Sequence, residues 1–370
     1  MVVAKKSIKF LVAFVLALTS FTALAQDETV ENNLIDSPDE IGAYIAHHLK
    51  DAHDFHLFTN NKTGVHYGFP LPVIVWTSNG LKTFMSSAFH HDDYGKVIVE
   101  AGDTKLVKYH SKIYELDDAA TALNFDADKH PTNAKKVIDF SITKSVFGML
   151  LTGLLMLLGF GALARGYKKG KTIPKGFSRV LEPLVIYVRD EIARPNIGEK
   201  KYRKFMGFLL TVFFFIWILN MLGLTPLGFN VTGQIAVTAC LAIFTMVIYL
   251  VSGTKYFWAH TLWMPGVPHV LRPILAVIEL VGFVLIKPFS LLLRLFANIT
   301  AGHFIVMSLI ALMVTLKASF GPVVSTGMSL VLALFIMLIE ILVAFLQAFI
   351  FTMLSSLFIG MAVEEHHEAH

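Results

Sequence analysis

Among the polar residues of the two long apolar stretches near the end of the sequence, five lie well inside the stretches and have types that can carry or hold charge. Arg294 and Asn298 are four residues apart, so both project from one face of a helix, and His303 follows one to two turns later. In the second stretch Glu340 is followed seven residues later by Gln347 on the same face. An imidazole and a carboxylate that are partly desolvated can relay protons, whereas an arginine keeps its charge.

The two stretches, residues 270–316 and 322–363, are separated by the short segment KASFGP. A helix of about 40 residues is about 60 Å long, which is twice the hydrocarbon thickness of about 30 Å. The sequence therefore predicts two long, strongly tilted membrane helices. Lys287 and Pro288 form the best candidate break, but a proline can kink a membrane helix without ending it.

A hairpin that folds back near residue 319 would bring together positions whose numbers add up to about 638. This register predicts Arg294 near Gln347, Asn298 opposite Glu340, and His303 about one turn from Glu340. An arginine in mid-membrane costs about 2.5 to 3.5 kcal/mol on insertion scales, and such a residue normally marks function. The alternative is an arginine that snorkels or pairs with a buried acid. The fixed cation would attract a passing carboxylate and favour its ionised form.

The composition places the chain in the membrane class, because 55% of its 370 residues are hydrophobic and only 16% are charged. The net charge of +4 does not indicate a nucleic-acid partner, since many basic residues crowd into one loop. The single cysteine, Cys240, excludes a disulfide and a multi-cysteine metal site. GYKKGKT has three residues between its glycines, not the four of a phosphate-binding loop. We expect no cofactor and no metal.

The amino-terminal region predicts an exported domain. Residues 1–25 combine three lysines, a short apolar run and an A-x-A pattern at Ala23-Leu24-Ala25, as in a cleaved signal peptide; an uncleaved anchor is the alternative. Residues 26–140 then read as a small α+β domain in the bacterial periplasm, with a helix at 42–58 and strands at 71–76 and 96–101.

Clustered histidines in this domain and in the tail raise the possibility of transition-metal binding, against the more common solvated surface. The residues concerned are His47, His48, Asp51, His53, Asp54, His56, His366, His367 and His370.

The remaining chain predicts an all-α polytopic membrane protein of about five spanning helices. Basic residues between the first and second spans place that loop in the cytoplasm by the positive-inside rule. An apolar stripe in the loop predicts an amphipathic helix, either on the leaflet or against a soluble partner. The expected segments are a first span at 141–164, the basic loop at 165–204, a hairpin at 205–252, the two long helices at 268–363 and a cytoplasmic tail at 364–370.

Three segments carry a resemblance to a known family. SLLLRLFANITAGH, residues 290–303, resembles the signature of the F-type ATP synthase a subunit family. LQAFIFTMLSSLFIGMAVEEH, residues 346–366, resembles its carboxyl-terminal signature, and NMLGLTPLG, residues 220–228, resembles its hairpin turn. The resemblance covers about residues 140 to 366. It implies the proton-translocating stator subunit of a rotary motor, which makes no ATP itself.

Carried over by position, the resemblance implies that Arg294 faces the carboxylates of a rotating c-ring, with Asn298 and Gln347 beside it. It implies that His303 and Glu340 line a half-channel open to the periplasm. In many bacterial members the acid and the histidine lie on the opposite helices.

The same resemblance implies that Glu279 lines the second half-channel, while Lys287 either lines it or snorkels. The implied partners are the c-ring, the b subunits of the peripheral stalk and membrane lipids, with no nucleic acid, in the bacterial inner membrane. H⁺ and Na⁺ both remain open as the coupling ion.

Two rival interpretations belong to other classes. In a self-contained channel or transporter Arg294 would bind an anionic substrate, but inverted repeats and interrupted helices are not clear in the sequence. An exported binding domain on a passive anchor would not explain Arg294, Glu340 and Gln347 in lipid.

Overall fold

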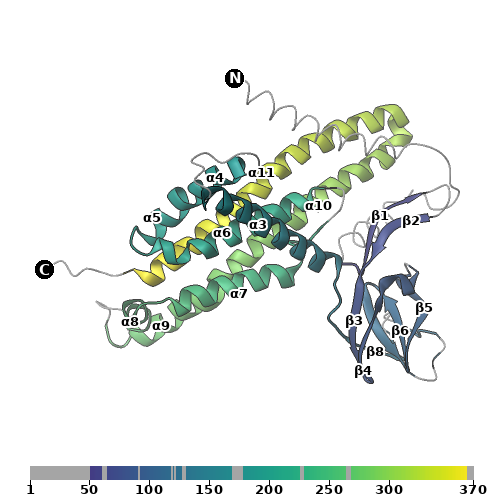
Figure 1. Ribbon diagram of the computed structural model, residues 1–370, viewed down its shortest axis with the longest axis horizontal. Coiled ribbons are helices and arrows are strands. Elements are labelled where there is room, and N and C mark those ends of the chain that lie inside the picture. The colour runs from purple at the N-terminus through teal and green to yellow at the C-terminus, as the bar shows by residue number, and fades with distance from the viewer. Residues whose placement is uncertain are drawn as a thin grey trace.

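A computed structural model describes the chain as a strand domain followed by a long helical bundle (Figure 1). The predicted signal peptide, His47, His48 and the three histidines of the tail lie outside the described residues. The residues described are 51–60, 65–90, 92–117, 120, 122–126, 131–168, 178–225, 229–263 and 268–364.

The strand domain is built from antiparallel sheets. Val73 and Val75 of one sheet pack against Leu106 and Ile113 of another, with Phe89 between them, so the domain has its own core. The three sheets are β1 (Asp54–Asn60) with β2 (Val65–Pro70), then β4 (Gly80–Met85), β3 (Pro72–Thr77) and β9 (Ile138–Asp139), and finally β5 (Tyr94–Ala101), β6 (Thr104–Tyr109), β7 (Lys112–Leu116) and β8 (Ala134–Lys136).

The helix expected at 42–58 is wrong where the structure describes it. Asp54–Asn60 is strand β1, paired with β2, and residues 42–50 lie outside the described part. Phe55 is 2% exposed because it packs against the helical bundle, and this tertiary contact overrides a weak local preference. The strands expected at 71–76 and 96–101 are present as β3 and β5.

Aromatic side chains join the strand domain to the bundle. The ring of Phe55 lies 5.3 Å from that of Phe229 and 5.9 Å from that of Phe147. The carboxylate of Asp51 accepts a hydrogen bond from the backbone N–H of Ser145 at 3.0 Å, at the start of the first long helix. This arrangement caps that helix and fixes the domain to its end of the bundle.

His53 contributes to the same junction. It is 3% exposed, and its Nε2 lies 2.6 Å from a carboxylate oxygen of Asp139. Burial raises the pKa of Asp139, but hydrogen bonds from His53 and Ser141 outweigh it and hold the pKa below the usual value. Among the described residues no three histidine, cysteine or acidic side chains are grouped as metal ligands would be.

The bundle confirms the expected membrane class. In the described part of the chain, four helices are long and apolar enough to cross a bilayer, and a fifth span arises if α7 and α8, which meet at 102°, count as one. The helices are α3 (Lys144–Lys168), α4 (Ser178–Tyr187), α5 (Arg194–Ile197), α6 (Tyr202–Gly223), α7 (Ile235–Val251), α8 (Lys255–Leu262), α9 (Arg272–Val281), α10 (Lys287–Phe320) and α11 (Pro322–Val363).

Pro288 distorts the first long helix without ending it. The turn Gly282–Ile286 is π-helical and joins α9 to α10, and the N–H of Lys287 donates to the carbonyl of Gly282, five residues back. Pro288 has no N–H for the carbonyl of Val284, and its ring crowds that carbonyl. A widened turn relieves this conflict, so the stretch stays helical.

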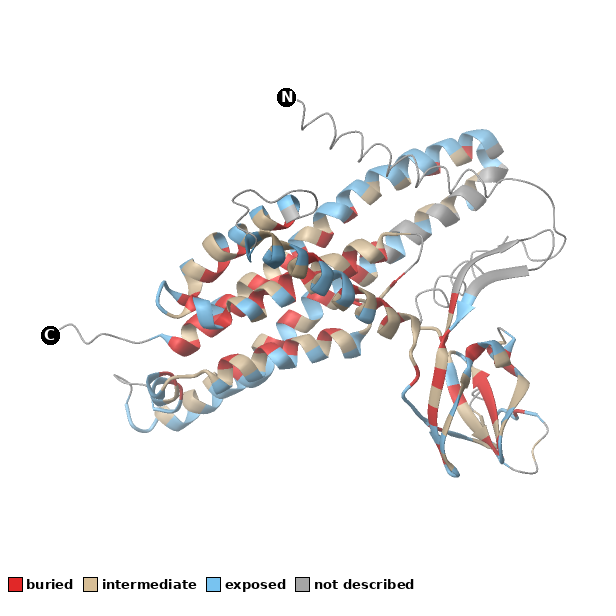
Figure 2. Ribbon diagram, in the orientation of Figure 1, coloured by how far each residue is buried: buried red, intermediate tan, exposed pale blue. Residues whose placement is uncertain are grey.

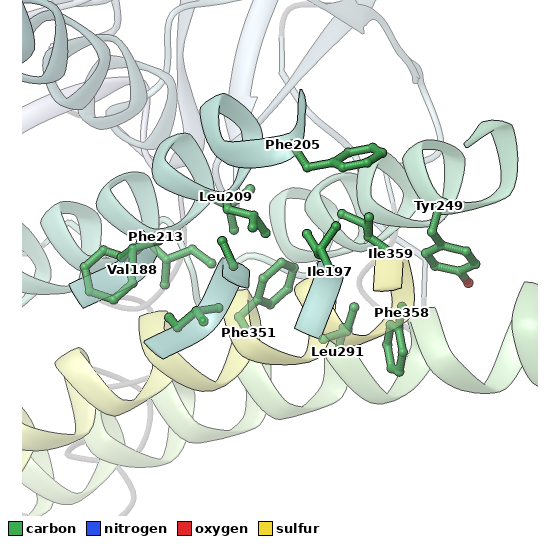
Figure 3. Packing of buried hydrophobic residues seen from close by; sticks show 14 of the residues in the cluster. Val188, Ile197, Phe205, Leu209, Phe213, Tyr249, Leu291, Phe351, Phe358 and Ile359 are labelled. Carbon is green, nitrogen blue, oxygen red and sulfur yellow. The ribbon is translucent and has the colours of Figure 1, made fainter. Parts of the chain in front are cut away.

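The apolar stripe before α6 packs against the chain's own membrane helices. Val188 and Ile192 are fully buried, and the hydroxyl of Ser356 on α11 donates to the carbonyl of Ile192 at 3.0 Å. Figure 3 shows Val188 and Ile197 beside Phe351 and Ile359 of α11. Neither the leaflet nor a soluble partner is therefore the main contact of this stripe.

Gly360 permits this close approach. A Cβ at Gly360 would lie 2.0 Å from the backbone carbonyl oxygen of Asn196. We predict that Gly360→Ala destabilises the chain by about 1 to 3 kcal/mol, as overpacking does. Gly207→Ala is the control, because a Cβ there meets no atom within 4 Å. Thermal unfolding of the purified protein in detergent measures both, and equal midpoints would contradict the prediction.

Candidate functional site

The turn between α10 and α11 sets the register of the site. Gly321 has φ +76°, which favours glycine, and α11 begins at Pro322 immediately after it. A Cβ at Gly302 would lie 2.3 Å from Oε1 of Glu340, so these two residues face each other. Their numbers add up to 642. The expected value of 638 is wrong because the chain turns two residues later than 319, which moves the register by about one helical turn.

This register changes the predicted neighbours. Gly302, and not Asn298, faces Glu340, and Asn298 lies one turn away along α10. His303 adjoins Gly302 in sequence and thus lies near the level of Glu340, but its side chain is outside the described ones. Arg294 comes level with position 348, beside Gln347, yet no hydrogen bond joins the guanidinium to the amide of Gln347.

Arg294 lies on the outer face of α10. Leu291, Leu295 and Ile299 on the other side of the helix are at most 6% exposed and pack inside the bundle. Arg294 and Asn298 are both exposed. Within the described part of the chain, Arg294 has neither an ion pair nor a hydrogen bond. A permanent cation therefore stands on an open helix face with no counterion among the residues that the structure describes.

Glu340 and Gln347 occupy the inner side of the hairpin. They are 9% and 3% exposed. A second buried polar pair lies close by: Thr232 Oγ1 donates to Asn220 Oδ1 at 2.8 Å, and Asn220 Nδ2 donates to the carbonyl oxygen of Ala344 at 3.4 Å. Ala344 is one turn from Glu340 on α11. Polar groups thus extend from the loop between α6 and α7 toward Glu340.

A separate polar region surrounds Glu279. It lines a cleft of about 220 Å³ whose other polar residues are Tyr256, His260, Thr261 and Glu364. The ammonium of Lys287 lies 3.2 Å from the centroid of the Phe283 ring, so a cation–π contact holds it against the bundle. The cleft opens near α8, at the end of the bundle remote from the strand domain (Figure 1).

Arg294 separates the two polar regions along one continuous helix. Glu279 precedes it by 15 residues, which corresponds to roughly 22 Å, and Gly302 follows it by eight residues, roughly 12 Å. Each region approaches the arginine from a different end of the bundle. The polar region at Glu279 and the one at Glu340 could each carry protons from one side toward the middle of the membrane. Arg294 lies between the two regions.

Three features of the site lie outside the sequence predictions. Gly302 is one of them, although an isolated glycine inside an apolar helix does indicate a packing requirement. The Asn220–Thr232 pair had no sequence signal beyond two polar residues near a turn. His260 and Glu364 meet Glu279 only through the fold.

Comparison with known proteins gives matches for both parts of the chain. The model of the ATP synthase A chain family matches residues 146–360, and that of a domain of unknown function (DUF8433) matches residues 44–140. ATP synthase subunit a of Chlorobium phaeobacteroides (strain BS1) is 46% identical over 239 residues, covering 62% of this chain and 69% of the relative. That of Chloroherpeton thalassium is 45% identical over 244 residues, covering 63% and 70%. That of Anaeromyxobacter sp. (strain Fw109-5) is 40% identical over 240 residues, covering 62% and 57%.

The contact between Gly302 and Glu340 predicts a paired effect. Gly302→Ala should destabilise the hairpin, by less than the roughly 1 to 3 kcal/mol typical of overpacking, because the new methyl group overlaps the movable carboxylate end of Glu340 and not backbone. Adding Glu340→Asp shortens the acid by one methylene and should restore part of the loss.

Thermal unfolding of the purified single and double variants measures this effect. Gly327→Ala on the same hairpin is the control, since a Cβ there meets nothing within 4 Å. A double variant no more stable than Gly302→Ala would show that the two residues are not in contact.

Proposed function

Because the chain belongs to the ATP synthase A chain family, we propose that it is the stator subunit a of a rotary F-type ATP synthase, and that Arg294 faces the acidic residues of the moving ring. The observation that carries this proposal is the exposed guanidinium on the outer face of α10, which pairs with none of the described side chains. A mid-membrane cation costs about 2.5 to 3.5 kcal/mol, so a structure that leaves it open requires a partner.

A ring carboxylate supplies the missing counterion. An opposite charge within about 4 to 6 Å lowers the pKa of a carboxyl by about 1 to 3 units. A protonated carboxyl that reaches Arg294 therefore loses its proton, and an ionised one is held there until it can be protonated again. Since arginine is not deprotonated in proteins, it also blocks direct proton passage between the two polar regions.

Protons reach the ring from the side of the strand domain in this proposal. Two observations support an access path there: the buried Asn220–Thr232 pair reaches the carbonyl of Ala344, one turn from Glu340, and Glu340 itself is a buried acid. His303 is assigned to the path by its position beside Gly302. Glu340 is held against the backbone of α10 at Gly302, so a proton on its carboxyl is already next to the helix that faces the ring.

Protons leave on the opposite side, through the cleft at Glu279. Its lining includes His260 and Glu364, both of which can accept or pass a proton. Asn298 lies one turn from Arg294 on α10, Gln347 lies close to the level of Arg294 on α11, and both are proposed to position the guanidinium. The two paths are offset along α9–α10. A proton therefore crosses the membrane only if a carboxyl of the rotating ring carries it from one path to the other.

The chain itself forms no ATP in this proposal. A charge that crosses 100 mV releases about 2.3 kcal/mol, so several ions must cross for each ATP formed elsewhere in the complex. The proposed partners are the c-ring and the b subunits of the peripheral stalk. The proposed location is the bacterial inner membrane, with the strand domain in the periplasm after removal of the signal peptide and the carboxyl terminus in the cytoplasm.

Loss of the cation gives the first test. Arg294→Ala should lower ATP-driven proton pumping by more than about tenfold. Without the guanidinium the pKa of the ring carboxyl is no longer lowered, and a change of one pKa unit corresponds to about 1.4 kcal/mol, or a factor of about ten in the release of its proton. Pumping is measured by dye quenching in inverted membrane vesicles. Arg179→Ala, which removes an exposed arginine of α4, should leave pumping unchanged. Pumping by Arg294→Ala at the level of the unmodified protein would refute the role.

Water access at Glu279 gives the second test. In a Cys240→Ser background, which removes the one cysteine of the chain, Glu279→Cys should react readily with a membrane-impermeant maleimide added from the side of α8. Leu285→Cys, at a position 65% exposed on the apolar surface, should react several-fold more slowly because it faces lipid. Labelling of Glu279→Cys only from the side of the strand domain would contradict an exit path there.

A further inference from the structure

The three-stranded sheet β4-β3-β9 has an outer face that is apolar and uncovered. Cross-strand pairing puts Trp76 between Leu81 and Ile138, so all three share one face. Ile74, Met85 and Phe140 continue this face by alternation along the strands. Trp76 and Leu81 are each 55% exposed, and Ile138 and Phe140 are each 62% exposed. We call these six residues the outer apolar face.

The inner side of the same sheet accounts for the domain's own stability. Val73 and Val75 are fully buried against the four-stranded sheet. The outer apolar face is therefore not needed for the core. It contains no charged side chain, because the one polar residue between its members is Thr83. A contiguous group of exposed apolar side chains is unusual on a sheet that faces water, and such a group marks a binding surface.

The position of the outer apolar face selects its occupant. The N–H of Phe140 donates to the carbonyl of Ile74 at 2.8 Å, and α3 begins only four residues later, at Lys144. Four residues span at most about 14 Å, so this face lies within reach of the interfacial layer that the helix crosses.

The helix α3 that follows the outer apolar face in sequence also carries exposed apolar residues. Leu154 and Leu157 of that helix are 52% and 75% exposed, as lipid-facing residues are in an isolated chain. Figure 2 shows exposed residues along both α3 and the β3–β4 part of the domain. In Figure 1 β3 lies on the side of the domain toward the bundle, and β5 lies on the far side.

We propose that the outer apolar face rests in the interfacial layer of the membrane leaflet on the strand-domain side and binds lipid there. Trp76 suits this place, since tryptophan is enriched where acyl chains meet headgroups. The contact adds a lipid-supported attachment to the protein–protein attachment at Phe55, Phe147 and Phe229. It restrains the domain against the bilayer while force acts on the neighbouring helices.

Site-specific photo-crosslinking in native membranes that contain the whole complex tests the proposal. Ile138 is replaced by p-benzoylphenylalanine, and Leu81 is replaced in a second variant in case the first fails to accumulate. Glu100, an exposed residue of β5 in the other sheet, is the matched control. After irradiation, mass spectrometry of the purified chain identifies the adducts.

We expect phospholipid adducts at Ile138 and Leu81 and at least several-fold fewer at Glu100. An adduct with another polypeptide would overturn the proposal by showing a protein partner on this face. An adduct with another segment of this chain would also overturn it, and so would lipid labelling no greater than at Glu100.

Discussion

The unpaired charge of Arg294 is the constraint on which the structure depends. The guanidinium stands on the open face of α10, deep in an apolar segment, while the opposite side of the helix is fixed by Leu291 and Leu295. The chain cannot lower the cost of that charge by turning the helix, because turning would expose the buried side. We propose that this charge is neutralised by a partner that approaches from outside, because no described residue of the chain pairs with it.

Close backbone contacts keep that face open. Gly302 lets Glu340 lie against α10, and Gly360 lets Asn196 lie against α11. The first contact holds α10 close to α11, and the second holds α11 close to α5. The π-helical turn before Pro288 then keeps α9 and α10 continuous, so that Glu279 and Arg294 remain on one rigid element.

Much of this architecture followed from the sequence, because apolar length and loop charge are properties of single segments. The long hairpin and the spans required no knowledge of tertiary contacts, whereas the outward direction of Arg294 was expected only from the family resemblance. The register of the hairpin did require it, since a turn displaced by two residues exchanges Asn298 for Gly302 as the neighbour of Glu340. Strand β1 was missed for a related reason: Phe55 is buried by Phe147 and Phe229, which are distant in sequence. The cleft at Glu279 likewise arises where three helices meet.

We propose that a ring acid is the counterion of Arg294, and a structure of the intact complex in a lipid bilayer measures this directly. We expect a ring carboxylate facing the guanidinium, within about 4 Å in direct contact or one bridging water further away, and lipid excluded between them. A guanidinium that faces lipid, or one paired with an acid of this chain or of the peripheral stalk, would contradict it.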